Sequence, residues 1–452
     1  MVRAGLGLAR ARGGGPEARR RGWALPLAVT AFALAMAAYL GDVAAHPGPM
    51  LSWYDLNVYN HAGLIARSSP GRLYSWQLKP GIKFTYTPFA ALLFAAGSLL
   101  PWAVLRWLMS VTSIIAVTAT AWLTLGGLGR RGRDRTVATL AVAAVAMWTE
   151  PVLRALQLGQ VELLLMALIA WDLCQPDRRW WKGAGVGVAA GIKLVPLIFI
   201  PYLVLAGKLR QALVASAAFA ATAVIGFAFL PRASTKWWLT GYFLHAGNVG
   251  DVGSLLNQSL YAMLTRVAGG VRAATPAWLG VSVIVAALGL AAAAVLHRSG
   301  RPVAGWVTCA LTGLLVSPIS WNHHWVWIVP VLALLADAAV RARGAKRWAY
   351  LALAGGVASV FGGWPEKWTG SAVFIPRGLL GFFIGPHPAH EKYHLHGLQL
   401  LSWNLYVLAG LVMLAFAAAA AARAWQDRPG PGGPGPGGPG PGRAEPCDLP
   451  GS

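Results

Sequence analysis

The sequence predicts an all-α polytopic membrane protein with about 12 transmembrane helices and elaborated loops on one face of the bilayer. The first observation is composition: 56% of the 452 residues are apolar and only 12% are charged. Soluble proteins carry about 45–50% apolar and about 25% charged residues. The second observation is that apolar runs recur along the whole chain between short basic loops. This pattern excludes a water-soluble globular enzyme and a disordered chain.

The first apolar run, 23–40, follows an arginine-rich segment, 1–22. It is too long for a cleaved signal peptide, so we expect an uncleaved first helix after a cytoplasmic basic N-terminus. The membrane domain then covers 23–427, and the Pro/Gly-rich segment 428–452 is expected to be a disordered cytoplasmic tail. The other predicted crossings are 103–127, 136–149, 160–174, 183–193, 194–206, 211–230, 277–297, 302–317, 325–340, 348–363 and 399–422.

Two apolar segments need separate treatment. The stretch 183–206 is divided into two crossings because Lys193 and Pro196 interrupt it. The stretch 85–101 contains Pro88 and ends at Pro101, so we expect a re-entrant or interfacial helix that does not cross.

Positive charge sets the predicted orientation. With both termini in the cytoplasm, all the basic clusters between helices face inward, which is the usual bias of membrane proteins; these are 130–135, 178–182, 208–210, 298–301 and 341–347. The net charge of +23 is therefore distributed as topology requires and does not indicate a nucleic-acid partner. The loops left outside are 42–84, 231–276, 318–324 and 364–398. We expect the protein to work at the extracytoplasmic face of the plasma membrane, because polar and aromatic residues gather in these loops.

The first outer loop contains Asp55, with Tyr59 on the same segment and Tyr86 just after it. A carboxylate near aromatic rings has a raised pKa, which suits a general base. A plain helix-capping role is the alternative. The two tyrosines are candidates for stacking on sugar faces.

Polar residues also interrupt the apolar helices. Arg154 and Gln160 lie between two apolar segments, where polar groups are favourable only beside a cavity. Lys193 lies at membrane depth, so it should face a cavity or a negative partner, unless it extends to the interface. We predict Lys193 and Arg154 as ligands of a phosphate and Gln160 as a substrate ligand.

Two later segments complete the predicted site. Asn257 and Gln258 carry the hydrogen-bonding groups that bind sugar hydroxyls, although they could equally cap a turn. Trp321, His323 and His324 lie in a polar cluster among tryptophans. Adjacent residues point about 100° apart on a helix, so we expect one histidine to face the site and the other to pack.

Two motifs point to other chemistry. His390-Glu391-Lys392-Tyr393-His394 matches the H-E-x-x-H motif of zinc proteases, but neighbouring prolines leave little room for the helix that motif needs. The glycines from Gly183 to Gly191 resemble a dinucleotide fingerprint without the preceding strand, and are better explained by close helix packing. Three cysteines cannot form a disulfide framework. We expect no metal and no cofactor.

Taken together, these segments resemble glycosyltransferase family 87, the actinobacterial polyprenol-phosphate-mannose-dependent α-1,2-mannosyltransferases that act on phosphatidylinositol mannosides and lipoglycans. The resemblance rests on six segments in order, namely 55–59, 84–89, 159–160, 191–196, 257–259 and 317–327. It implies a GT-C type fold with an outer active site, in which the family's first-loop aspartate, the base, matches Asp55 and its histidine pair matches His323 and His324. Thr87 and Glu162 depart from the family's usual residues.

The resemblance implies an inverting transfer of mannose from a lipid-linked donor to the 2-hydroxyl of a mannose on a cell-envelope glycolipid. An arabinosyl- or glucosyltransferase of the same fold is the alternative. A transporter or flippase would be expected to contain internal repeats, which the sequence lacks. A zinc membrane protease is the remaining alternative. Which histidine acts, the acceptor, the number of sugars added and the oligomeric state stay open.

Overall fold

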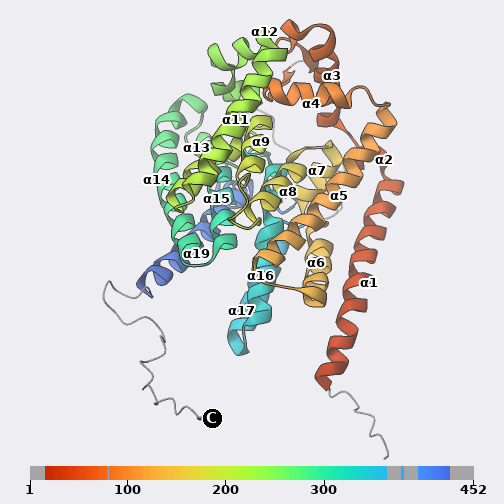
Figure 1. Ribbon diagram of the computed structural model, residues 1–452, viewed down its shortest axis with the longest axis vertical. Helices are drawn as coiled ribbons and strands as arrows, with labels where there is room; N and C mark the ends of the chain where they lie inside the picture. The colour runs from red at the N-terminus through yellow and green to blue at the C-terminus, as the bar shows by residue number, and fades with distance from the viewer. Residues whose placement is uncertain (1–15, 80, 364–377, 381–394, 428–452) are drawn as a thin grey trace, which may run out of the picture.

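The computed structural model describes residues 16–79, 81–363, 378–380 and 395–427, and the chain is mostly helical over these residues (Figure 1). The H-E-x-x-H motif at 390–394, most of the expected outer loop 364–398 and the tail 428–452 lie outside the described residues.

The helices are numbered along the chain. They are α1 (Pro16–Ala45), α2 (Pro47–Met50), α3 (Tyr54–Ser68), α4 (Pro88–Gly97), α5 (Trp102–Gly127), α6 (Gly132–Ala146), α7 (Glu150–Leu158), α8 (Glu162–Leu173), α9 (Ala184–Ile192), α10 (Phe199–Leu205), α11 (Leu209–Phe229), α12 (Pro231–Ser234), α13 (Leu260–Val267), α14 (Val271–Arg298), α15 (Pro302–Val316), α16 (Ile328–Arg341), α17 (Gly344–Val360), α18 (Gly397–Trp403) and α19 (Leu405–Gln426). Short turns of other helix types are η1 (Pro70–Arg72), η2 (Val195–Ile198), η3 (Thr235–Leu239), η4 (Tyr242–Leu244), η5 (Ala246–Asn248) and η6 (Asn322–Trp327), and one hairpin pairs β1 (Gln77–Lys79) with β2 (Ile82–Lys83).

Every predicted apolar run is helical, but the helices differ in length. Within the described residues, six are long and apolar enough to cross a bilayer: Gly22–Ala45, Trp102–Gly127, Leu209–Phe229, Val271–Arg298, Asn322–Arg341 and Leu405–Gln426. The pair α7 and α8 makes a seventh if it is one broken span. The other predicted runs form shorter helices, so the count of twelve crossings stays a prediction.

Both interruptions expected from the sequence appear as breaks in the helices. α9 ends at Ile192, and the backbone of Lys193 is extended (φ −139°, ψ 130°) before the turn η2 begins. The segment 85–101 contains only the ten-residue helix α4, which at about 1.5 Å per residue is far shorter than the bilayer core.

The polar segment between the predicted crossings 136–149 and 160–174 forms a helix that was not expected, α7, which meets α8 at a sharp bend. The two helices meet at an angle of 117°. Gly159 ends α7 in a left-handed conformation (φ +68°), and a Cβ on it would lie 2.7 Å from the Cβ of Leu56 on α3. A glycine is therefore required where the bend touches the start of α3.

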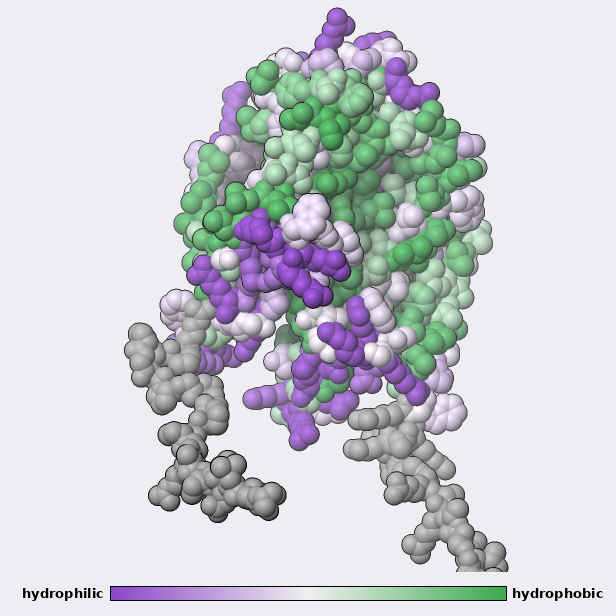
Figure 2. All heavy atoms as spheres, viewed as in Figure 1, coloured by the Kyte–Doolittle hydropathy of each residue, from purple (hydrophilic) through white to green (hydrophobic). Residues whose placement is uncertain are grey.

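The arrangement of the elements separates two ends of the molecule. α1 begins and α19 ends near the lower end of Figure 1, whereas α3, α4 and α12 lie at the upper end. Figure 2 shows hydrophobic side chains over the middle of the visible face and hydrophilic side chains gathered at the lower end. α1 packs against α6, and its hydrophobic side chains such as Leu27 and Leu34 are more than 60% exposed. Such exposed apolar surface fits contact with lipid.

Candidate active site

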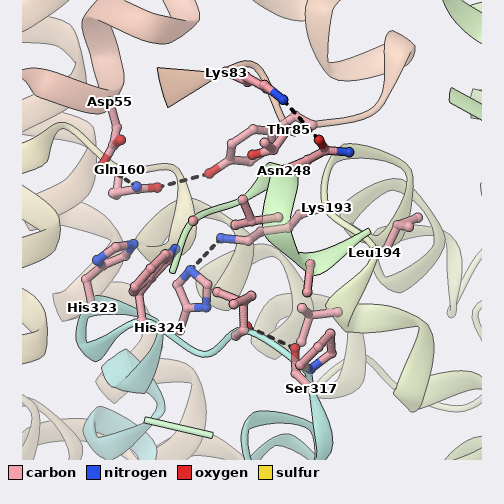
Figure 3. A pocket seen from close by; sticks show the side chains of 18 of the residues that line it. Asp55, Lys83, Thr85, Gln160, Lys193, Leu194, Asn248, Ser317, His323 and His324 are labelled. Carbon is pink, nitrogen blue, oxygen red and sulfur yellow. Dashed lines mark hydrogen bonds between the residues drawn. The ribbon is translucent and has the colours of Figure 1, made fainter. Parts of the chain in front are cut away.

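A cavity of about 720 Å³ lies among segments that are far apart in the sequence. It is lined by the start of α3, the β1–β2 hairpin, the segment 85–87 that leads to α4, the α7–α8 bend, the break at Lys193, residues 237–256 and residues 313–324. Parts of three of the four predicted outer loops therefore meet at one cavity. Figure 3 shows Asp55, Gln160, Lys193, His323 and His324 around it.

Asp55 is held by the junction of α3 with α7. Trp53, which precedes α3, has a left-handed backbone (φ 50°) that is uncommon for a residue other than glycine. Its N–H donates to the carbonyl of Gln157 at 3.0 Å, which ties the start of α3 to the end of α7. Asp55, in the first turn of α3, lines the cavity and lies within reach of Gln160 in the bend.

Gln160 connects Asp55 to the two tyrosines. Its Nε2 donates to Asp55 Oδ2 at 2.5 Å, and its Oε1 accepts from the hydroxyls of Tyr59 at 2.6 Å and Tyr86 at 3.1 Å. An ionised carboxylate can only accept, so the N–H of the amide must face Asp55 and the amide oxygen faces the two hydroxyls. Gln160 and the tyrosine hydroxyls therefore position the carboxylate, whereas the sequence predicted them as substrate ligands.

The surroundings of Asp55 raise its pKa to about 6. Burial is the largest cause, and the Gln160 hydrogen bond and the charges of Arg154 and Lys193 oppose it. α3 lies outside the candidate membrane spans. A carboxyl with this pKa is ionised at neutral pH and is a stronger base than an ordinary aspartate.

Lys193 lies opposite Asp55 in a charged cluster. Its Nζ contacts the carboxylate of Glu162 and lies 2.9 Å from Nε2 of His324. The same His324 nitrogen is 3.2 Å from Glu162 Oε1. Lys193 also lies over the ring of Tyr86, with Nζ 5.3 Å from its centre. The lysine therefore has both features expected from its sequence, a negative partner and a cavity.

Both histidines line the cavity, so the expectation that one of them would pack away from it is wrong. They lie in the first turn of η6, and their rings are 4.7 Å apart at 82°. His324 contacts the Glu162–Lys193 pair, while both ring nitrogens of His323 are buried and have no hydrogen-bond partner among the residues that the structure describes. His323 is thus available to a ligand in the cavity.

Glu162, His323 and His324 are also the group that comes closest to a metal site among the described residues. One ligand atom from each lies within 4.8 Å of the others. However, the ammonium of Lys193 already contacts both Glu162 and His324. A positive charge therefore occupies the place that a metal ion would need, and the donor set fits a lysine ion pair better than a cation site.

The remaining predicted residues divide into two groups. Arg154 and Trp321 line the cavity, and Arg154 donates to the side chain of Gln157 at 2.5 Å. Asn257 and Gln258 are fully buried and outside the lining. Asn257 Oδ1 accepts from the N–H of Ser320 at 2.9 Å, and Gln258 Oε1 accepts from the N–H of Tyr406 at 3.2 Å. The Asn257 amide therefore supports the chain that leads to the histidines, and the Gln258 amide contacts the start of α19. Neither residue lines the cavity.

Sequence reasoning gave no role to two residues that line the cavity and to one that contacts its lysine. Glu162 was noted only as a departure from the family's usual residue, although it pairs with Lys193. Lys83 and Asn248 line the cavity and contact each other at 3.2 Å. Glu162 could have been identified from the sequence, because a charged residue at the start of an apolar helix needs a partner of opposite charge. A lysine in a polar loop carries no such signal.

The family model of glycosyltransferase family 87 matches residues 84–318. A polyprenol-phosphate-mannose-dependent α-(1-2)-phosphatidylinositol pentamannoside mannosyltransferase of Mycobacterium tuberculosis (strain CDC 1551 / Oshkosh) is 33% identical over 67% of this chain and 71% of its own length. The corresponding protein of Mycolicibacterium smegmatis is 33% identical over 67% of this chain and 74% of its own.

A second type of relative is similar over much the same length. A polyprenol-phosphate-mannose-dependent α-(1-2)-phosphatidylinositol mannoside mannosyltransferase of Mycobacterium tuberculosis (strain ATCC 25618 / H37Rv) is 31% identical over 63% of this chain and 69% of its own. No solved structure matches the chain.

Proposed function

Since the chain belongs to glycosyltransferase family 87, we propose that it transfers mannose from polyprenyl-phosphate-mannose to the 2-hydroxyl of a mannose on a cell-envelope glycolipid of the phosphatidylinositol mannoside or lipomannan type. The new linkage is α-1,2. The observation that carries the proposal is the cavity in which Asp55 lies opposite the Lys193–His324 pair.

The chemistry is a single displacement that inverts the anomeric carbon. Asp55 takes the proton of the acceptor hydroxyl while that oxygen attacks C1 of the donor mannose. The bond from C1 to the phosphate oxygen breaks, and polyprenyl phosphate leaves with the electron pair. Lys193 and Arg154, with one of His323 and His324, stabilise the charge on the departing phosphate. Trp321 offers a face for sugar stacking. No metal is required, because the lipid phosphate is already a good leaving group.

The membrane arrangement is part of the same proposal. The fold is of the GT-C type with about 12 crossings, the active site opens at the extracytoplasmic face of the plasma membrane, and both termini are cytoplasmic. The upper position of α3 and the lower position of the ends of α1 and α19 support this orientation (Figure 1). The lipid donor and the glycolipid acceptor then both reach the cavity from the bilayer.

Asp55→Asn tests the proposal. The amide keeps the size of the side chain but cannot act as the base, so mannose transfer in isolated membranes should fall by about 10²-fold or more. Expression level and detergent-extracted melting temperature are the folding controls. Retention of most of the activity would exclude Asp55 as the base.

The donor is tested with labelled polyprenyl-phosphate mannose, arabinose and glucose in the same membranes. Transfer of mannose alone supports the proposal, whereas transfer of arabinose or glucose favours the alternative enzyme of the same fold. Activity that persists in the presence of a chelator agrees with a metal-independent displacement. Activity lost to the chelator and restored by a metal contradicts it.

A further inference from the structure

Lys83 is a cavity residue to which the mechanism above gives no role. It belongs to the short strand β2, is half-buried, and lines the cavity. Its Nζ donates to Oδ1 of Asn248 at 3.2 Å, and Asn248 in turn donates through Nδ2 to the carbonyl of Tyr242 at 3.2 Å. Figure 3 shows the amine of Lys83 turned toward Asn248 at the cavity wall, across from the histidines.

The two lysines that line the cavity differ in their partners. Lys193 contacts the carboxylate of Glu162, so its charge is compensated. Lys83 contacts no carboxylate among the residues that the structure describes. An ammonium group has three N–H donors, and the neutral amide of Asn248 accepts only one of them. A charge and two donors therefore remain for an anion in the cavity.

We propose that Lys83 binds the phosphodiester of a lipid substrate, at an anion position separate from the one beside Lys193. The proposal rests on the proposed function, because that function brings two lipids with a phosphodiester to this cavity, the polyprenyl-linked donor and the phosphatidylinositol-based acceptor. The chemistry is the same for both: a singly charged phosphate oxygen accepts from an oriented ammonium. Asn248 holds the lysine so that little side-chain freedom is lost on binding.

Lys79 provides a matched control on the same hairpin. It is exposed in β1, pairs with Ile82 in the register, and is not among the cavity-lining residues. Removing its charge weakens any general attraction of the hairpin to an anionic bilayer as much as removing that of Lys83. A difference between Lys83→Gln and Lys79→Gln therefore reports on the cavity alone.

The first experiment measures KM for donor and acceptor separately in the full-length protein in detergent. Lys83→Gln should raise the KM of one substrate about tenfold, as expected for the loss of a charged hydrogen bond. The KM values of Lys83→Arg and of Lys79→Gln should both stay close to those of the wild type. A rise for the donor assigns Lys83 to the polyprenyl phosphate, and a rise for the acceptor assigns it to the phosphatidylinositol. An equal rise in Lys79→Gln, or no rise at all, overturns the proposal.

The second experiment needs no catalysis. Binding of a short-chain polyprenyl phosphate and of phosphatidylinositol to the detergent-solubilised protein is compared between the two variants. Weaker binding of one lipid to Lys83→Gln than to Lys79→Gln supports the anion position, whether or not mannose is transferred. A lack of mannose transfer would count against the proposed function alone. Equal binding by the two variants contradicts the anion position even in an active mannosyltransferase.

Discussion

At the scale of single residues, the site depends on how the protonation of Asp55 is controlled. Burial raises its pKa to about 6, and the base must be ionised to accept a proton. Mannose transfer, measured as kcat/KM, should therefore fall as the pH drops through about 6 and level off above it. A profile that stays flat down to pH 4.5 would contradict this assignment, because an unperturbed aspartate titrates near pH 3.9.

Gln160 offers a second test at this scale. Gln160→Glu replaces the N–H that faces Asp55 by a carboxylate oxygen, and a second negative charge raises the pKa of Asp55 further. The acid limb of the pH profile should therefore move to higher pH, with a lower kcat at neutral pH and a smaller change in the KM of the donor.

The matched control for that change is Gln77→Glu on the exposed strand β1, which adds the same charge outside the cavity lining. Its profile should coincide with that of the wild type. A Gln160→Glu profile that also coincides would show that the glutamine does not position the base.

At the scale of elements, the α7–α8 bend places the base relative to its partners. Gly159→Ala puts a Cβ where the backbone is left-handed and where Leu56 lies 2.7 Å away. The left-handed conformation alone costs about 1–2 kcal/mol. We expect a lower melting temperature in detergent and a loss of activity, because α3 must move away from the bend and takes Asp55 with it.

Gly280→Ala is the control for this prediction. Gly280 lies within α14, and a Cβ on it would meet nothing within 4 Å. Alanine should leave activity unchanged and the melting temperature unchanged or slightly raised, since it favours the helix. If Gly159→Ala behaves like Gly280→Ala, the bend tolerates a side chain and the proposed constraint is wrong.

At the scale of the whole molecule, the prediction concerns which end faces outward. Single cysteines are introduced at exposed positions, Ser75 after η1 and Arg343 between α16 and α17, after Cys174, Cys309 and Cys447 have been replaced by serine. A membrane-impermeant maleimide should label the first in intact cells and the second only after lysis. The reverse pattern would place the cavity loops in the cytoplasm and contradict the proposed topology.

The sequence alone determined the helical membrane class and the family. It also singled out Asp55, Lys193, His323 and His324, which line one cavity in the structure. The membrane class follows from apolar length and basic loops, and Lys193 from the cost of a charge in an apolar segment. The family, with Asp55 and the histidine pair, follows from the resemblance of six segments taken in order. The family is confirmed by the match over residues 84–318.

The tertiary structure alone decided what the neighbours of these residues do. Gln160 donates to Asp55, and Tyr59 and Tyr86 donate to Gln160. Asn257 and Gln258 accept from backbone N–H groups, and Glu162 contacts Lys193. Each of these roles depends on which groups a side chain meets across more than 30 residues of sequence. A buried polar group needs a hydrogen-bond partner, and the fold determines which groups lie near enough to be that partner. The residue type shows only that a partner is needed.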